Sequence, residues 1–304
     1  ISEPRVTLKK MMSNIIIAGC GFLGRALIPQ LVKQEQDALC LMQSKQSEDL
    51  ILALGMPTQR LDFDRASELS TLDTQAKDIY YFAPPAKTDD SDQRMVNFLA
   101  RCEAAVPRRI VYISTSGVYG DCAGDWVNED AELKPITARA KRRVYAENCL
   151  LTFCKKYNCE YQILRVGGIY GAERLPLHRL SAIKVIDPEQ APYSNRIHVD
   201  DLASVCLAAM SAERCNEIFN VADGSPSSMT DFYFSIADRA QLQRPEAVSL
   251  DAADTELSPA MLSFINEARR LDITKMQLLL QPVLRYSNLQ AGLDHCFGQL
   301  KAKN

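Results

Sequence analysis

The sequence has little histidine, little tryptophan and almost no net charge. Its 304 residues include three histidines and one tryptophan, and the formal net charge is −3. So small a charge argues against a field that attracts nucleic acid or an anionic membrane surface. No apolar run approaches the roughly 20 residues that a membrane-spanning helix needs. We therefore expect neither a nucleic-acid partner nor a membrane partner.

The ten cysteines are scattered and show no metal-binding pattern. No two of them form a Cys-x-x-Cys pair, and three histidines offer little help in building a metal site. Cysteines within apolar segments usually behave as small buried hydrophobic residues. We expect reduced structural thiols rather than disulfides, no metal site and a reducing, cytoplasmic location.

The sequence does contain a regular alternation of strand-like and helical segments. Helical spacing of apolar residues is clearest over 91–106. The alternation predicts a parallel sheet that helices cover on both faces. The strand-like runs lie at 14–20, 38–43, 58–63, 78–83, 108–114 and 159–166.

A glycine-rich turn follows the first strand-like run and opens a helix. Residues 19–24 read G-C-G-F-L-G, and in this position G-x-G-x-x-G predicts a dinucleotide-binding turn. Gly19 would permit the tight turn, Gly21 would let the backbone approach a diphosphate, and Gly24 would let the helix pack on the strand. The alternative is a glycine-rich turn that binds nothing.

The residues around the second and third strands bear on which dinucleotide is bound. The helix after the turn would present the N–H groups of Phe22 and Leu23 to the phosphates. An acidic residue that holds the adenosine ribose is expected about 20 residues further on. Residues 43–45, at the end of the second strand-like run, read Gln-Ser-Lys and contain no carboxylate. Ser44 and Lys45 could contact a 2′-phosphate instead. NADP is therefore slightly preferred over NAD. Asp62 could meet the adenine, or it could be an ordinary turn residue, as Lys45 could be an ordinary loop residue.

Three further segments follow the glycine turn in a fixed order: VYISTSGVYG at 111–120, ILRVGGIYG at 163–171 and RIHVDDLA at 196–203. Together with the turn they resemble the extended short-chain dehydrogenase/reductase superfamily, the NAD-dependent epimerase/dehydratase family. The resemblance covers about residues 13–222. It implies an α/β fold with a Rossmann-type, doubly wound parallel sheet of about seven strands and a smaller C-terminal substrate lobe.

The resemblance also implies a division of the chain. Residues 12–166 would form the dinucleotide-binding core, to which 196–222 return. Residues 167–195 and 223–304 would form the substrate-side lobe. We interpret residues 1–11 as a leader or an expression remnant, because they lack the apolar run of a signal peptide. A small-molecule substrate is implied without its identity, and a homodimer is a family expectation.

The family's catalytic helix departs from its usual pattern here. The resemblance implies a Tyr-x-x-x-Lys pair, and the flanking markers Pro135 and Glu147 place Arg139 at the Tyr position and Arg143 at the Lys position. Arginine keeps its proton near neutral pH, so neither residue can be the acid or base. Both can bind phosphate, carboxylate or ribose oxygens, and Arg143 could contact the cofactor. Thr115 occupies the family's hydroxyl position, although it could simply cap a strand end.

This pattern is similar to atypical family members such as the bacterial YeeZ-like proteins, which lack most of the usual active-site residues. Two functions stay open. The chain is either an NAD(P)-dependent oxidoreductase or epimerase with a rearranged acid/base group, or a catalytically inactive NADP(H)-binding sensor or scaffold. Tyr145 does not restore the pair, because it lies two residues past Arg143 and points away. Arg174 resembles a position near the substrate phosphates, and we expect Asp200 and Asp201 to cap a helix.

Overall fold

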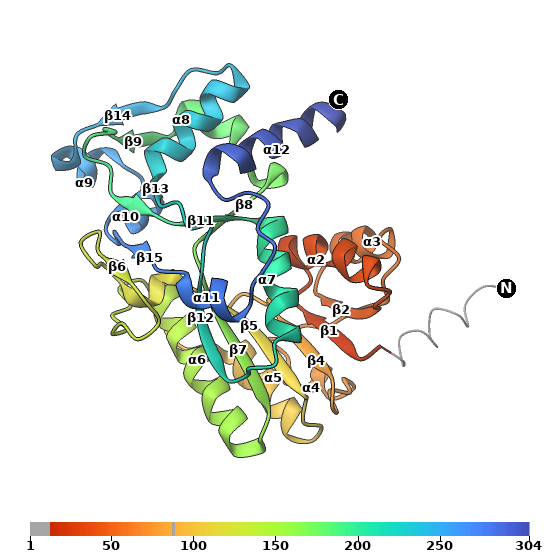
Figure 1. Ribbon diagram of the computed structural model, residues 1–304. Helices are drawn as coiled ribbons and strands as arrows, with labels where there is room; N and C mark the ends of the chain where they lie inside the picture. The colour runs from red at the N-terminus through yellow and green to blue at the C-terminus, as the bar shows by residue number, and fades with distance from the viewer. Residues whose placement is uncertain (1–12, 87–88, 304) are drawn as a thin grey trace.

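Seven parallel strands form the central sheet. The computed structural model describes residues 13–86 and 89–303, so the segment interpreted as a leader lies outside the described residues. The strand order is β12-β7-β5-β4-β1-β2-β3, and every neighbouring pair is parallel (Figure 1). This doubly wound, Rossmann-type arrangement confirms the predicted fold class. The strands are β1 (Ile15–Ala18), β2 (Ala38–Met42), β3 (Thr58–Arg60), β4 (Asp78–Tyr81), β5 (Arg109–Thr115), β7 (Glu160–Val166) and β12 (Glu217–Val221).

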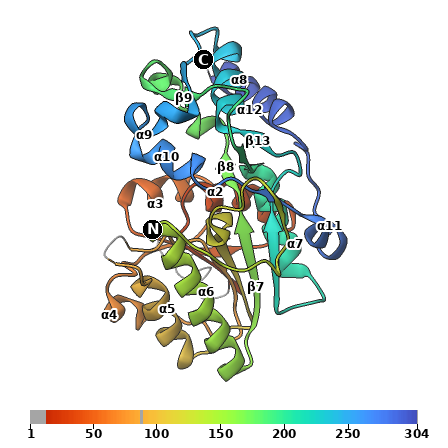
Figure 2. The ribbon, with the colours of Figure 1, turned by 90° about the vertical axis from the view of Figure 1, so that its left-hand side faces the viewer.

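Alternating side chains place one hydrophobic cluster on each face of this sheet. In β1, Ile15 and Ile17 belong to one cluster, and Ile16 and Ala18 belong to the other. This follows from the two-residue period of a strand. Helices α2 and α7 complete the first cluster and α5 and α6 the second, so that Figure 2 shows β7 between α7 and α6. The helices are α2 (Phe22–Lys33), α3 (Lys45–Leu52), α4 (Ala66–Leu69), α5 (Gln93–Glu103), α6 (Ala138–Tyr157) and α7 (Val199–Ser211).

Helix α6 has both of its ends fixed by local sequence. The Thr137 hydroxyl accepts a hydrogen bond from the Ala140 N–H over 3.3 Å, which satisfies one of the free donors of the first turn. The helix ends at Asn158, whose φ of 55° lies in the left-handed region. Arg139 and Arg143 therefore lie in its first two turns. Neither α6 nor any other helix of the described residues is both long and apolar enough to cross a membrane.

The order in which strands are added to the sheet reverses beside β1, and this topological switch point is where a ligand is expected to bind. From β1 the chain builds β2 and β3 on one side and then crosses to β4 on the other. Ligands of such sheets bind outside the carboxyl ends of the strands at this point. The glycine turn lies at this edge because it follows β1 directly, and Thr115 lies there because it ends β5.

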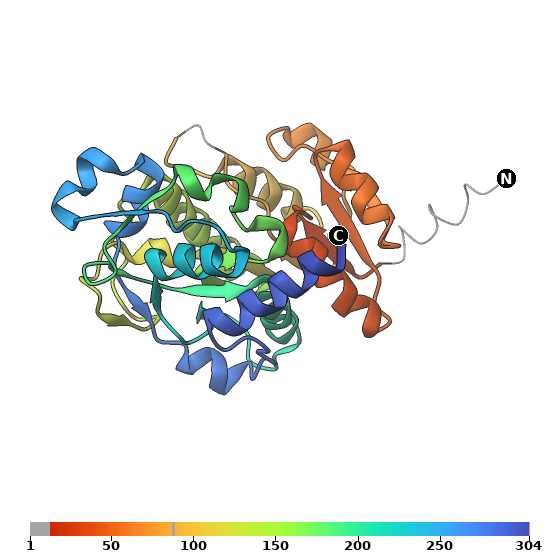
Figure 3. The same cartoon turned by 90° about the horizontal axis from the view of Figure 1, so that it is seen from above.

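A smaller lobe covers the carboxyl ends of the strands, and from above its cyan α8 and dark blue α12 lie in front of the sheet (Figures 1 and 3). One hydrophobic cluster of this lobe lies around α8 and α12, and a second lies around α9 and α10. Its helices, with α11 below them, are α8 (Met229–Ala240), α9 (Ala253–Glu256), α10 (Pro259–Ile265), α11 (Thr274–Leu279) and α12 (Leu289–Lys303). Short turns of 3-10 helix are η1 (Ser116–Tyr119), η2 (Ala172–Arg174), η3 (Leu177–Ala182) and η4 (Leu250–Ala252).

Four two-stranded pairs join segments that are far apart in the sequence. Each is short, and three of the four are parallel. The pairs are β8 (Gly168–Tyr170) with β11 (Arg196–His198), β9 (Lys184–Ile186) with β14 (Glu246–Val248), β10 (Tyr193–Ser194) with β13 (Ser227–Ser228), and β6 (Trp126–Val127) with β15 (Arg270–Leu271).

Candidate active site

The turn after β1 requires glycine at its first position. Gly19 has a φ of +87°, which side chains rarely adopt, and a Cβ there would lie 2.5 Å from the backbone N and Cα of Ala83. The N–H groups of Gly19 and Cys20 donate to the Leu41 carbonyl over 3.1 and 2.8 Å. The turn is therefore held tightly between the ends of β2 and β4.

The other two glycines of the turn do different things. A Cβ on Gly24 would lie 2.6 Å from Sγ of Cys20, so α2 packs directly against the turn and β1. A Cβ on Gly21 would meet no atom nearer than the Gly19 carbonyl oxygen at 4.0 Å, so the space outside the turn is open. Helix α2 begins at Phe22 with no side-chain cap on its first N–H groups. Open space beside free N–H donors fits the diphosphate of a dinucleotide.

A cavity of about 260 Å³ continues from the turn toward β2 and β3. Ser44 and Asp62 line it together with the glycines, so the structure brings these predicted residues together. Ser44 also caps α3 by accepting a hydrogen bond from the Ser47 N–H over 3.2 Å. Lys45 is exposed at the start of the same helix, where its ammonium lies 2.8 Å from the Asp49 carboxylate.

Arg94 also lines this cavity, although no sequence motif indicated it. Its guanidinium donates twice to the Asp64 carboxylate, over 2.7 Å in each case, and once to the Pro84 carbonyl over 3.0 Å. The hydrogen bonds from Arg94 hold the pKa of Asp64 below its usual range. Arg94 reaches the cavity because α5 packs beside the loop that follows β3, where Asn97 donates to the Phe63 carbonyl over 2.9 Å.

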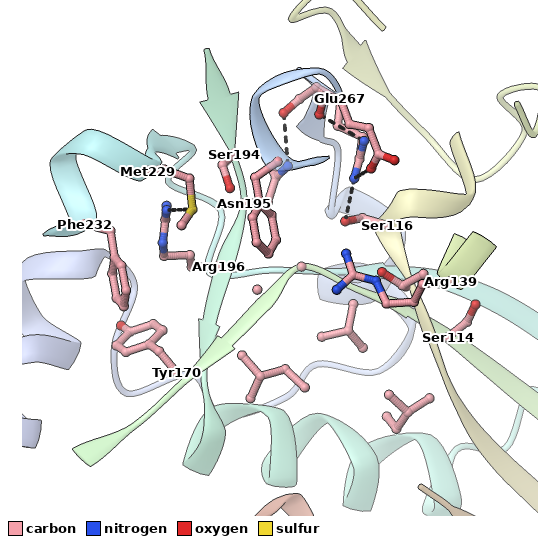
Figure 4. A pocket seen from close by; sticks show the side chains of 18 of the residues that line it. Ser114, Ser116, Arg139, Tyr170, Ser194, Asn195, Arg196, Met229, Phe232 and Glu267 are labelled. Carbon is pink, nitrogen blue, oxygen red and sulfur yellow. Dashed lines mark hydrogen bonds and ion pairs between the residues drawn. The ribbon is translucent and has the colours of Figure 1, made fainter. Parts of the chain in front are cut away.

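A larger cavity, of about 490 Å³, lies at the carboxyl ends of β5 and β7 beneath the smaller lobe. Figure 4 shows Ser116 and Arg139 on one side of it and Arg196 and Phe232 on the other. Its polar lining is mostly cationic and hydroxylic, with a single carboxylate, Glu267, among the described residues. The cations are Arg139, Arg143, Arg174, Arg196 and Arg269, and the hydroxyl and amide groups belong to Ser114, Thr115, Ser116, Ser194 and Asn195.

Two of these arginines have neither an ion pair nor a side-chain hydrogen bond within residues 13–86 and 89–303. The Arg139 guanidinium lies 5.6 Å from the centre of the Phe264 ring, and that of Arg174 lies 4.2 Å from the centre of the Phe22 ring. A guanidinium that stacks on a ring keeps its N–H donors free at its edge. Both side chains can therefore bind an anion. Because Phe22 begins α2, Arg174 stands where the larger cavity meets the glycine turn.

The other arginines already have protein partners. Arg143 donates to the Tyr112 hydroxyl over 3.1 Å. Arg196 is buried and donates to Oγ of Ser227 over 2.9 Å, and burial lowers its pKa to about 10. Arg269 pairs with the carboxylate of Glu267 over 3.2 Å. These three arginines add positive charge to the cavity, but part of their hydrogen-bonding capacity is already used by protein groups.

A buried network fixes the hydroxyl side of the cavity. Ser114 donates to the Glu147 carboxylate, which lies 2.9 Å from the Arg165 guanidinium. Arg165 also donates to the Tyr119 hydroxyl over 3.1 Å, and burial raises the pKa of Tyr119 to about 12. Glu147 therefore ties α6 to β5 and β7, which is a structural role for this family marker.

Thr115 lies beside that network, at the end of β5. Its hydroxyl accepts a hydrogen bond from the Gly117 N–H over 3.2 Å, so it caps η1, and it also lines the larger cavity. The capping role and the site role that the sequence left open are thus compatible. Its O–H is still available as a donor to a ligand.

The Glu267–Arg269 pair closes the cavity from the loop before β15. Both side chains are buried, and Nη2 of Arg269 lies 3.2 Å from Oε2 of Glu267. Arg269 also donates to the Gly120 carbonyl over 2.7 Å and lies 3.5 Å from the Ser116 hydroxyl. The sequence analysis missed this pair, because the two residues reach η1 only through the fold of the smaller lobe.

The segment after β11 corrects one expectation. Neither Asp200 nor Asp201 caps α7; the cap is His198, whose Nδ1 accepts from the Asp200 N–H over 3.2 Å. Asp201 instead accepts from the N–H groups of residues 285 and 286, over 2.9 Å each, and so fixes the tail. Burial lowers the pKa of His198 to about 4. Oδ2 of Asp200 lies 3.5 Å from Nε2 of His295. These two residues and His198 are close enough together to hold a metal ion, so the expectation of no metal site stays a prediction.

Comparison with known proteins decides the family. A model of the NAD dependent epimerase/dehydratase family matches residues 15–222. The chain belongs to this family. It thereby joins the extended short-chain dehydrogenase/reductase superfamily, as the four sequence segments indicated.

Relatives of the family show how far the likeness extends. A putative UDP-glucose 4-epimerase of Methanocaldococcus jannaschii is 21% identical over 253 residues, which are 72% of this chain and 79% of that protein. A functionally unknown conserved protein from Silicibacter pomeroyi superposes with a TM-score of 0.78 at 27% identity, over 94% of this chain and 98% of that one. A UDP-glucuronic acid 4-epimerase from Bacillus cereus, solved with UDP-glucuronic acid and NAD, has a TM-score of 0.73 at 18% identity, over 95% and 99%. This last likeness shows the fold alone.

Two cavities thus contain most of the predicted residues. Gly19, Gly21, Ser44 and Asp62 line the smaller one. The larger one has Thr115, Arg139 and Arg143, together with Arg174. Gly24 and Leu23 instead pack within α2 and its hydrophobic cluster. Tyr145 is exposed and lies outside the lining of both cavities, as its position on α6 predicted.

Proposed function

We propose that this chain is an NAD(P)-dependent oxidoreductase or epimerase that acts on a small anionic molecule. One observation supports this most strongly: a cavity lined by five arginines and one carboxylate lies at the carboxyl ends of β5 and β7. Arg174, on its rim, stacks on Phe22 at the start of the glycine-turn helix. A cofactor on that turn and an anion in the cavity would thus be neighbours. Bound NAD(P) would supply the hydride acceptor or donor.

In this proposal Arg139 and Arg143 of α6 bind ligand oxygens and do not transfer protons. Arg139 stands at the family's Tyr position and binds an anionic oxygen of the substrate, since its guanidinium has no carboxylate partner in the described residues. Arg143 stands at the Lys position, where its contact with Tyr112 holds it toward the nicotinamide ribose. Thr115 donates a hydrogen bond to a substrate oxygen. Ser44 and Lys45 hold a 2′-phosphate, which makes NADP slightly preferred.

A second function is favoured by a specific observation. Positions 139 and 143 of α6 carry arginine, not the phenol and amine of the family's usual pair, so the usual proton path is missing. A protein that binds NADP(H) without turnover, as a sensor or scaffold, would need only the glycine turn and the smaller cavity. It would have no need of a cavity rich in unpaired arginine, and for this reason we place it second.

The deciding experiment measures hydride transfer. Purified protein is incubated with NAD+ or NADP+ and with a panel of hydroxy acids, sugar phosphates and nucleotide-diphosphate sugars, including UDP-glucose and UDP-glucuronic acid. Reduced nicotinamide is followed by fluorescence, and epimer exchange by deuterium from labelled NADPH. Turnover with an anionic member supports the proposal. Saturable cofactor binding with no transfer to any member would favour the sensor.

Matched variants separate the binding role of α6 from a general loss of charge. Arg139→Ala should lower the affinity for the active panel member by about 10-fold or more, because a charge-assisted contact is lost. Arg244→Ala is the control, since this exposed guanidinium pairs with Asp238 on the smaller lobe, away from the cavity. Equal effects of the two changes would contradict the assignment of Arg139.

The cellular location, the domain division and the oligomeric state of the protein are part of the same proposal. All ten cysteines are free thiols, which supports a reducing, cytoplasmic location. We also propose the division into a core of residues 12–166 and 196–222 and a lobe of residues 167–195 and 223–304. A homodimer is proposed from the family, and light scattering of the purified protein tests it.

A further inference from the structure

Glu267 lines the larger cavity as its single carboxylate among the described residues. Its side chain is 6% exposed, and its Oε1 has no hydrogen-bond partner among the described residues. Its other oxygen, Oε2, accepts a hydrogen bond from Arg269 over 3.2 Å. Because a buried carboxylate oxygen without a partner is costly, such a group requires an explanation. A ligand hydroxyl that donates to Oε1 would satisfy it.

The fold holds this carboxylate against the end of β5. A Cβ on Gly117 would touch Oε2 of Glu267 at 3.5 Å, so the carboxylate lies directly on the first turn of η1. Arg269 bonds the Gly120 carbonyl and reaches Ser116, which fixes the pair to the same turn. Figure 4 shows Glu267 on the side of the cavity that carries Ser116 and Arg139. The carboxylate therefore lies in the wall of the cavity where the proposed substrate binds.

The other groups of the cavity cannot accept a proton. Arg139 and Arg143 stay protonated near neutral pH. The hydroxyl of Tyr170 packs against Gly292 of α12 instead of entering the cavity, and burial raises its pKa well above the usual value. Serine and threonine hydroxyls are too weakly basic without a base beside them, and Glu147, the carboxylate beside Ser114, is paired with Arg165 over 2.9 Å. Glu267 is the carboxylate that is left.

We propose that Glu267 is the proton acceptor of this site and that the substrate is a small molecule carrying both an alcohol and an anionic group. The inference rests on the proposed function. As the alcohol is oxidised, its O–H bond breaks and the proton moves to Oε1, its carbinol C–H bond breaks and the electron pair leaves as hydride, and a C=O bond forms. Bound NAD(P) in its oxidised form is the hydride acceptor. In the reverse direction the protonated carboxyl returns the proton to the carbonyl oxygen.

Arg269 is a positioning residue in this scheme. Its contacts keep Glu267 in one orientation. Arg139, with its free N–H donors, would bind the anionic group of the same substrate.

The test compares Glu267→Gln with Glu256→Gln, an exposed control whose carboxylate pairs with Lys184. The substrate probe is the panel member that reduces NAD(P)+ fastest with the wild type. Glu267→Gln should slow this reduction by about 100-fold or more, while cofactor affinity stays within about 2-fold. Formate should partly restore the rate of Glu267→Ala. The control should behave as the wild type does.

A readout that needs no turnover accompanies these rates. Infrared difference spectra of protein carrying 13C-carboxyl glutamate should show one carboxylate band that shifts when the probe binds and that is absent in Glu267→Gln. Glu267→Asp keeps the charge and serves if the Gln variant fails to fold, as its melting temperature will show. Wild-type rate in a folded Glu267→Gln protein, or no shifted band, overturns the role of Glu267 alone. No transfer by the wild type with any panel member overturns the proposed function, and this inference falls with it.

Discussion

The guanidinium of Arg165 lies 2.9 Å from the carboxylate of Glu147, and both side chains are buried. Removing one partner would leave an uncompensated buried charge, which typically costs 3–5 kcal/mol. We expect Glu147→Ala to lower the free energy of unfolding by about 3 kcal/mol or more, as measured by urea denaturation. Glu103→Ala, which breaks an exposed pair with Lys156, should cost less than about 1 kcal/mol. Similar losses in the two variants would show that the pair does not anchor α6.

Gly19→Ala should destabilise the fold more than the same change at Gly55. Both residues have positive φ, of +87° and +80°, so alanine is strained at either position. A Cβ at Gly19 would also collide with the Ala83 backbone at 2.5 Å, whereas one at Gly55 meets nothing within 4 Å. We expect Gly55→Ala to cost about 1 kcal/mol and Gly19→Ala several times more, as judged from thermal unfolding. Equal costs would mean that the turn is looser than the structure shows.

Asp223 should make stability depend on pH. Burial raises the pKa of its carboxyl from 3.8 to about 7, so the native state keeps a proton that the unfolded state loses above about pH 4. The free energy of unfolding therefore falls as pH rises from about 4 to about 7. Asp223→Asn removes this dependence and should gain at most about 4 kcal/mol over the wild type above pH 7.

The measurement is the difference between variant and wild-type stability at several pH values. Taking the difference matters because His198, with a pKa lowered to about 4, acts in the opposite sense: its contribution is lost as pH falls below its ordinary value of 6.5. Asp251→Asn, an exposed change on the smaller lobe, is the control and should show no such trend. A difference that does not vary with pH would contradict the raised pKa of Asp223.

Lys45→Ala should discriminate between the two cofactors. If Lys45 leaves Asp49 to meet a 2′-phosphate, the variant should bind NADPH about 5-fold more weakly and NADH as before. Lys33→Ala, on α2, is the matched surface control. A loss of NADH affinity of the same size, or no change with either dinucleotide, would remove Lys45 from the cofactor site and the reason for preferring NADP.

The sheet and the glycine turn could be predicted because their signals are local. A run such as Ile15–Ala18 reveals a buried strand, and the G-x-G-x-x-G spacing over 19–24 marks the turn that follows it. The alternation of strands and helices predicted the parallel sheet, whereas the strand order came only from the structure. The same holds for Arg139 and Arg143, because Pro135 and Glu147 fix their place on one helix.

The lobe side of the site could not be predicted in this way. Arg269 and Ser116 are 153 residues apart in the sequence and meet only when the smaller lobe folds over η1. Glu267 lies in a stretch of mixed charge that resembles any solvated surface. Asp201 reads as a helix cap, and only the path of the tail past α7 reveals that it binds residues 285 and 286 instead.

The most direct test of the account is calorimetry of NADH and NADPH binding to the wild type and to Gly21→Ala. Gly21 has a φ of −97°, and its added Cβ would meet no protein atom nearer than 4.0 Å, so the variant should fold as the wild type does. We predict one dinucleotide bound per wild-type chain and an affinity about 10-fold or more lower in the variant, because its methyl group occupies the space of the diphosphate. No binding by the wild type, or equal binding by both proteins, would contradict the central claim.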